Sequence, residues 1–246
     1  MNRPVRFLLA LLSLRRRRTW GPFTETYERS GFDHAFEISW SQGGEDLALL
    51  HLIEVGQSAG TYVDVGAHHP SRFSVTRHLS QRGWTGVNID ANPLLVAEFG
   101  IARPQDINIC AAIGFQESYS FTIFSEPAIS TISKEWEERF ISAGETIDSV
   151  IQVPGITLRK VFDEYLVGRR VDVLNIDIEG ADFEALRSLD LETYSNAMWP
   201  IWLILETEPP LKKALGQDAV RYATNLGYVL HCVLPMATIL KAPDCK

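Results

Sequence analysis

The sequence predicts an α/β fold, in which helices cover a mostly parallel sheet of seven strands that ends in an antiparallel hairpin. Three observations lead to this prediction. Short apolar runs alternate with amphipathic segments along the chain, which is typical of a parallel sheet with helical crossovers. These runs are apolar at nearly every position, as expected of strands covered on both faces. The last two runs lie too close together for a helix between them, so we expect a hairpin.

Each element follows from its local pattern. The helix expected at 45–55 carries leucines and Ile53 at a spacing that buries one face. The helix at 74–82 ends at Gly83, and Asn92 before Pro93 is a good start for the helix at 93–99. The other expected helices are 134–142, 157–166, 182–189 and 218–226, and the expected main strands are 61–65, 86–90, 107–113, 171–177, 201–208, 228–234 and 238–242.

The middle of the chain departs from this alternation. Residues 118–124 alternate with Tyr119, Phe121 and Ile123 on one face, a period of two that indicates an antiparallel strand. A further strand at 150–153 is expected to end at Pro154. We interpret this region as a mid-chain insertion into the βα series and not as a separate domain.

Composition and length bound the domain organisation. The 246 residues are 46% hydrophobic and 22% charged, which is ordinary for a globular protein. We expect an N-terminal tail and lead-in at 1–40 and a single domain at 41–246. Beyond the first 18 residues the chain has 17 basic against 31 acidic residues. Such a body is a poor candidate for nucleic-acid binding, which requires a basic face.

The tail combines an apolar run at 7–14 with six arginines, Arg3, Arg6 and those at 15–18. The run is too short to span a bilayer, and the arginines follow it, unlike in a signal peptide. One interpretation is peripheral contact with anionic lipid, and the alternative is a frayed tail or a short packed helix. The three scattered cysteines, Cys110, Cys232 and Cys245, predict no disulfide framework or zinc site. Cys110 and Cys232 are expected to be buried reduced thiols, which fits a cytoplasmic location.

Acidic residues end several strands at the edge where open parallel sheets bind ligands. Asp64 and Gly66 follow the first strand, Asp90 ends the second, Asp177 and Glu179 follow a later one, and Glu206 ends another. Gly66 lets a ligand approach the backbone closely, and Asp90 can grip ribose hydroxyls. The loop lacks the second and third glycines of a pyrophosphate site. It therefore suits an adenosine ligand without phosphates, which favours S-adenosylmethionine over NAD.

These motifs resemble the FkbM family of S-adenosylmethionine-dependent O-methyltransferases. The resemblance rests on "SQGGED", "YVDVGAHHPSRFSVT", "RGWTGVNIDANP", "AAIG" and "VDVLNIDIEGADFEAL", and runs from about Ser41 to Glu208. The chain departs from the family near His68 and at Val75. The resemblance implies a Rossmann-like class I methyltransferase fold and a hydroxyl acceptor on a sugar or glycan precursor. It implies that the cofactor is held by Gln42, Glu45, Asp64, Gly66, Asp90, Ala91, Ala112 and Asp177.

For catalysis we expect Glu179 as the general base and His69 as the alternative, with Asp177 beside them. The two histidines of the loop equally fit a purely structural role. A divalent metal held by Asp177, Glu179 and a histidine is chemically sensible but not favoured, because Asp-x-Glu alone fixes no coordination geometry. Two other functions stay open, an NAD-dependent oxidoreductase and a non-catalytic membrane-peripheral protein that binds the cofactor.

Overall fold

The computed structural model describes residues 38–53, 57, 59–208 and 211–243. All elements below belong to the unit Ser39–Lys246. The predicted tail at 1–40 lies almost wholly outside the described residues, as does Cys245, so the arginine tail stays a prediction. Within the described ranges, no helix is both long and apolar enough to cross a bilayer.

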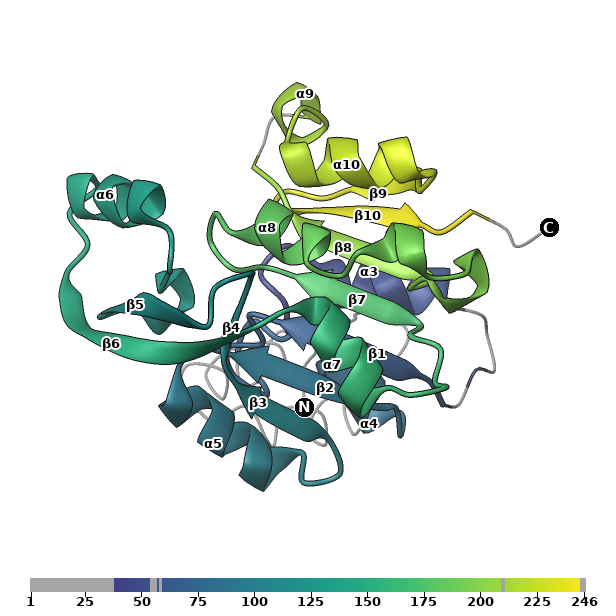
Figure 1. Cartoon of the computed structure of the whole chain (residues 1–246), viewed down its shortest axis with the longest axis horizontal. Helices are drawn as coiled ribbons and strands as arrows, with labels where there is room; N and C mark the ends of the chain where they lie inside the picture. Colours follow the sequence, from purple (N-terminus) through teal and green to yellow (C-terminus); the bar gives the residue numbers. More distant parts are fainter. Residues whose placement is uncertain (1–37, 54–56, 58, 209–210, 244–246) are drawn as a thin grey trace, which may run out of the picture. The chain divides into compact units, whose positions relative to one another are not determined.

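The main sheet has seven strands, and only one of them runs against the others (Figure 1). In spatial order the strands are β3 (Ile107–Cys110), β2 (Thr85–Asp90), β1 (Thr61–Val65), β7 (Val173–Ile176), β8 (Trp202–Glu206), β10 (Ala237–Lys241) and β9 (Val229–Val233). Strand β10 pairs antiparallel with both β8 and β9, and the other pairings are parallel. The predicted parallel sheet with a closing hairpin is confirmed.

Alternate residues of the central strands pack into two separate cores. Val63 and Leu174 point into one core, with α7 (Leu158–Tyr165), α8 (Asp182–Arg187) and α10 (Asp218–Leu226). Their neighbours Tyr62 and Val173 point into the other core, with α3 (Glu45–Leu52) and α4 (Arg77–Gln81). A buried aliphatic side chain contributes about 1.5–3 kcal/mol, so both cores hold the sheet in place.

Several helix ends follow the sequence signals. The Asn92 side chain accepts a hydrogen bond of 3.0 Å from the Leu94 N–H and starts α5 (Pro93–Ala102). Helix α10 ends at Gly227, which has φ 113°. Helix α3 differs in its buried face, because Leu49 and Ile53 are buried there and Leu47 and Leu50 are only half-buried.

The predicted insertion is a second, three-stranded sheet with the order β4 (Ala112–Ile113), β6 (Ile147–Ile156) and β5 (Ser118–Phe124). A short 3-10 turn η1 (Pro127–Ile129) and helix α6 (Lys134–Ser142) connect β5 to β6, and α6 lies away from the main sheet (Figure 1). Strand β5 pairs antiparallel with β6, as its period of two predicts.

Three local predictions were wrong. The expected strand 107–113 is divided at Ala111, whose N–H bonds the Asp90 carbonyl, so its second half belongs to the other sheet. Strand β6 continues through Pro154, which lies where pairing with β5 ends and pairing with β4 begins. Proline is tolerated at such interruptions of a ladder. Cys110 and Cys232 are free but half-exposed, and not fully buried.

The strand order reverses between β1 and β7, which lie side by side although about 110 residues separate them in the chain. Open α/β sheets bind their ligands at this switch point, beyond the carboxyl ends of the strands. The predicted site residues after β1, β2 and β7 therefore meet at one edge.

Candidate active site

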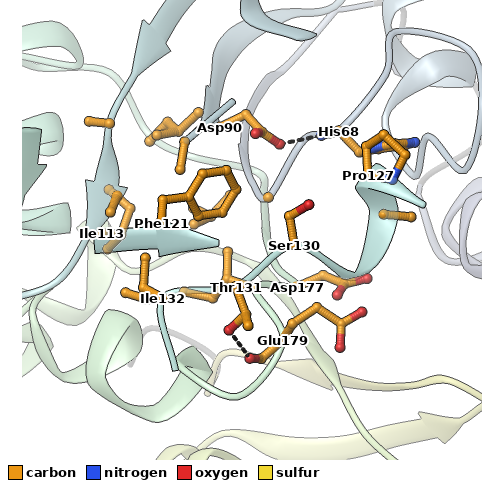
Figure 2. A pocket seen from close by; sticks show the side chains of 18 residues that line it. His68, Asp90, Ile113, Phe121, Pro127, Ser130, Thr131, Ile132, Asp177 and Glu179 are labelled. Carbon is orange, nitrogen blue, oxygen red and sulfur yellow. Dashed lines mark hydrogen bonds between the residues drawn. The ribbon is translucent and has the colours of Figure 1, made fainter. Parts of the chain in front are cut away.

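An open cavity lies at this edge of the sheet. Its lining includes Gly66 after β1, Asp90 at the end of β2 and Asp177 after β7. The insertion closes it from the other side with Phe121 and the segment 127–132 (Figure 2).

The turn after β1 requires glycine. Gly66 has φ 75°, and a Cβ built on it would overlap the carbonyl oxygen of Asp177. The turn also takes part in a sheet-like contact with β2, since the Gly66 N–H donates to the Ile89 carbonyl at 2.9 Å. Glycine therefore lets the β1 turn lie directly against the segment that follows β7.

Asp64 lies behind this turn and does not line the cavity. Its carboxylate accepts a hydrogen bond of 2.6 Å from the Thr76 hydroxyl and one of 2.9 Å from the Asn175 amide. The buried Arg103 donates to Thr76 at 2.8 Å and to the Pro70 carbonyl at 2.8 Å. Asp64 thus shapes the loop 66–76 from inside, and the direct cofactor contact expected of it finds no support in this placement.

Asp90 presents its carboxyl group to the cavity. One oxygen accepts from the Asn92 N–H at 2.7 Å and the other from the His68 N–H at 2.8 Å (Figure 2). Burial raises the pKa of this carboxyl to about 6, against these backbone hydrogen bonds, which lower it. Each carboxylate oxygen can accept a second hydrogen bond, so the ionised group can hold the two hydroxyls of a ribose.

Opposite Asp90, Asp177 and Glu179 line the cavity, and Glu206 lines a second cavity that adjoins it. Burial and the charges of neighbouring acids hold the pKa values of Asp177 and Glu206 well above their usual range. Burial, followed by the charge of Asp182, raises the pKa of Glu179 to about 8, and Arg139 opposes this shift. Figure 2 shows the carboxyl groups of Asp177 and Glu179 pointing the same way. A carboxyl with a pKa near neutrality is suited to general acid–base catalysis.

The backbone at Glu179 is left-handed. Its φ is 50° and that of Gly180 is 95°, a conformation that costs a non-glycine residue about 1–2 kcal/mol. The Thr131 hydroxyl of the insertion donates to the Glu179 carbonyl at 2.8 Å (Figure 2), and the Trp136 indole packs against Gly180. The insertion therefore holds the acid-bearing turn in a strained conformation, as is common at functional sites.

A second open cavity shares Gly66, Asp177 and Glu179 with the first. Gln42 and Glu45, at the start of α3, line it together with Glu206. Glu45 is only 4% exposed, and one of its oxygens accepts from the Gly43 N–H at 3.0 Å. Its other oxygen, Oε1, is buried without a hydrogen-bond partner. An unpaired buried oxygen of this kind suits a ligand that donates hydrogen bonds or carries positive charge.

The two histidines of the loop have different environments. His69 lines neither cavity, because its Nδ1 accepts from the Ser71 and Arg72 N–H groups at 2.9 Å and its Nε2 contacts Glu98 at 2.9 Å. Because both ring nitrogens of His69 are occupied in this way, its contacts favour a structural role over that of the alternative base. His68 lines both cavities, and its Nδ1 is buried without a partner. Burial lowers the pKa of His68 to about 4, so this imidazole is neutral at pH 7.

Most of the predicted cofactor residues meet at the two cavities. Ala91 and Ala112 line the first cavity beside Asp90, as the family resemblance implies for residues that hold the cofactor. Sequence reasoning did not single out Asn175, a polar residue within an otherwise apolar strand that lines the second cavity. It also did not identify the segment 127–132, which carries no recognisable motif. The Tyr119 hydroxyl donates to Glu184 at 2.9 Å and lines neither cavity, so of the insertion strand's aromatics Phe121 is the one at the site.

The strand order, the antiparallel β10 and the position of the cavity define a Rossmann-like class I methyltransferase fold. The family model described as "Methyltransferase FkbM domain" matches residues 64–230. This match covers most of the chain, and the protein belongs to the FkbM methyltransferase family. Membership implies S-adenosylmethionine as the cofactor and speaks against the NAD-dependent alternative.

The chain also resembles a solved structure, a TehB-like SAM-dependent methyltransferase from Corynebacterium glutamicum ATCC 13032. The two are 11% identical, with a TM-score of 0.41 over 89% of this chain and 97% of that chain. The comparison with curated proteins found no match.

Proposed function

We propose that the protein transfers a methyl group from S-adenosylmethionine to a hydroxyl of a sugar or glycan precursor. The observation that carries this proposal is the placement of Asp90 and Glu179 on opposite sides of one cavity. Asp90 offers acceptors suited to a ribose, and Glu179 offers a carboxyl suited to take up the proton of a hydroxyl. The acceptor class comes from the family resemblance.

The residues around the cavities fit the cofactor. Asp90 would hold the ribose hydroxyls, with Ala91 and Ala112 beside the adenine. Gln42 and Glu45 would meet the methionine end, where the unpaired oxygen of Glu45 can accept from the ammonium group. When bound, the cofactor supplies an electrophilic methyl group on its sulfonium.

The chemistry required of the protein is alignment and proton removal. The methyl group would pass to the acceptor oxygen, and the electron pair of its carbon–sulfur bond would stay on sulfur. Alignment of the two reactants supplies much of the acceleration. Glu179 takes up the hydroxyl proton, and a positioned base contributes about 10²–10⁴-fold. Asp177 lies beside Glu179 and lines both cavities.

The test is incubation with methyl-labelled S-adenosylmethionine and a panel of sugar nucleotides and glycans. We expect label in at least one acceptor as a methyl ether. The Glu179→Gln variant should lose about 10²–10⁴-fold in transfer rate while S-adenosylhomocysteine affinity is kept. Glu164→Gln is a matched control, because Glu164 pairs with Lys160 on the surface and lines neither cavity.

A non-catalytic cofactor-binding protein tethered through the N-terminal arginines would give a different result. It would bind S-adenosylhomocysteine without labelling any acceptor, and Glu179→Gln would leave its behaviour unchanged. The membrane contact itself rests on residues outside the described part, and vesicles containing anionic lipid would test it separately.

A further inference from the structure

Two residues that line the second cavity each carry a buried polar atom without a hydrogen-bond partner. One atom is Oε1 of Glu45, and the other is Nδ1 of His68. Among the described residues, the other unpaired buried side-chain atoms belong to Arg77, Trp84 and Gln217, which line neither cavity. Buried polar atoms in folded proteins are nearly always paired. Two unpaired atoms at one cavity therefore indicate a ligand that supplies the missing partners.

The contacts of His68 determine which of its ring nitrogens carries the proton. Burial lowers the pKa of this imidazole to about 4, so at pH 7 the ring is neutral and has a single N–H. Its Nε2 lies 3.4 Å from Nη1 of Arg72, and a guanidinium can only donate hydrogen bonds. Nε2 is therefore the acceptor and the proton lies on Nδ1. The unpaired atom of His68 is thus a hydrogen-bond donor.

Neighbouring side chains hold the His68 ring in one position. His68 is 9% exposed, and its ring stacks on that of Phe73 with the centroids 6.0 Å apart and the planes at 22°. The Arg72 guanidinium lies 4.2 Å from the Phe73 centroid and donates two hydrogen bonds, of 2.8 and 2.5 Å, to Glu126 of the insertion. A donor held in this way loses little conformational freedom when a ligand binds it.

The unpaired donor and the unpaired acceptor match the two charged groups of an amino acid. The proposed function gives the ammonium group of the methionine end to Glu45, and the carboxylate on the same carbon atom then requires donors nearby. Neither cavity is lined by a lysine or an arginine from the described ranges, so neutral groups have to hold this carboxylate. The His68 imidazole and the Gln42 amide both line the second cavity and can donate.

We propose that the Nδ1–H of His68 donates a hydrogen bond to the carboxylate of the cofactor's methionine moiety. This inference rests on the proposed function, because it assigns a further contact to the same cofactor. The main-chain N–H of His68 donates to Asp90 at 2.8 Å (Figure 2), the acid expected to hold the ribose. One residue therefore acts at both ends of the cofactor, and its side chain selects adenosine ligands that carry an amino-acid carboxylate.

The test compares two ligands in calorimetric titrations at pH 8. One is S-adenosylhomocysteine, and the other is its decarboxylated analogue, which keeps the ammonium group. The unmodified protein should prefer S-adenosylhomocysteine. His68→Phe keeps an aromatic ring but lacks the N–H, so it should reduce this preference at least about 10-fold, the loss expected when a hydrogen bond to a charged group is removed. His68→Asn restores an N–H and tolerates the positive φ of 53°, so it should recover part of the preference.

The matched control is His231→Phe, because His231 is an exposed residue of β9 and lines neither cavity. This variant should bind both ligands as the unmodified protein does. If His68→Phe does not fold, His68→Leu replaces it, since leucine also lacks a donor.

Failure of this inference can be told apart from failure of the proposed function. A His68→Phe variant that keeps the full preference for S-adenosylhomocysteine overturns the inference. A variant that loses the same affinity for both ligands overturns it as well, because His68 then acts on a part of the cofactor that both ligands share. An unmodified protein that does not bind S-adenosylhomocysteine would instead count against the proposed function.

Discussion

The affinity for the cofactor should depend on pH through Asp90. Its pKa is raised to about 6, first by burial, so the free protein holds a neutral carboxyl below that pH. Only the ionised group offers acceptors on both oxygens beyond the backbone N–H groups that already bind it. Cofactor binding is therefore full above pH 6 and is lost progressively as the pH falls through 6.

The size of the effect follows from the fraction of ionised carboxyl. The apparent dissociation constant rises by the reciprocal of that fraction, which for a pKa of about 6 is about 11-fold at pH 5 and about 1.1-fold at pH 7. Asp90→Asn removes the titration and the charge-assisted hydrogen bonds, each of which is worth about 1.5–3 kcal/mol. The variant should bind about 10-fold more weakly or worse at pH 8, with a flat profile below it.

The assay is calorimetric titration with S-adenosylhomocysteine between pH 5 and pH 8. Asp190→Asn is the control, because Asp190 is paired with Arg159 on the surface and lines neither cavity. An unmodified protein whose affinity is constant over this range would refute the reasoning. An Asp90→Asn variant that loses affinity with the same midpoint would show that another group is responsible.

Three further predictions concern the scaffold of the site. Gly66→Ala should weaken S-adenosylhomocysteine binding at least 10-fold in a titration, because the added carbon overlaps the Asp177 carbonyl at a positive φ; affinity equal to that of the unmodified protein would contradict this. Arg103→Met should lower the free energy of unfolding in urea by about 3–5 kcal/mol, because it leaves buried acceptors unpaired. Glu126→Gln should lower it by about 1 kcal/mol or less, because the ion pair with Arg72 is about 40% exposed. The reverse order of the last two would refute the distinction between buried and exposed charge.

The main sheet and the strand-end residues could be predicted because each depends on local patterns. Apolar runs predict buried strands, and parallel strands place their carboxyl ends at one edge. Gly66, Asp90 and Asp177 follow such strands, and all three line the cavity. The capping of α5 by Asn92 is equally local.

The remaining features depend on contacts that join distant parts of the chain. Which of two adjacent histidines faces the cavity is decided by Glu98 and the loop N–H groups that occupy His69. The approach of Glu206 to Asp177 depends on the pairing of β7 with β8. The division of strand 107–113 depends on β6, which begins about 35 residues later. Local patterns carry no information about these partners.

The insertion gives the protein two hydrogen-bonded sheets with separate tasks. Strands β1, β2 and β7 carry the residues expected to contact the cofactor, whereas β5 and the segment 127–132 close the cavity from the other side. Substitutions in the smaller sheet can therefore reshape this wall of the cavity without breaking a ladder hydrogen bond of the larger one. Thr131 is the exception, because its hydroxyl holds the turn at Glu179 and a substitution there would affect that residue directly. Elsewhere, the two walls of the cavity can therefore vary in sequence independently of each other.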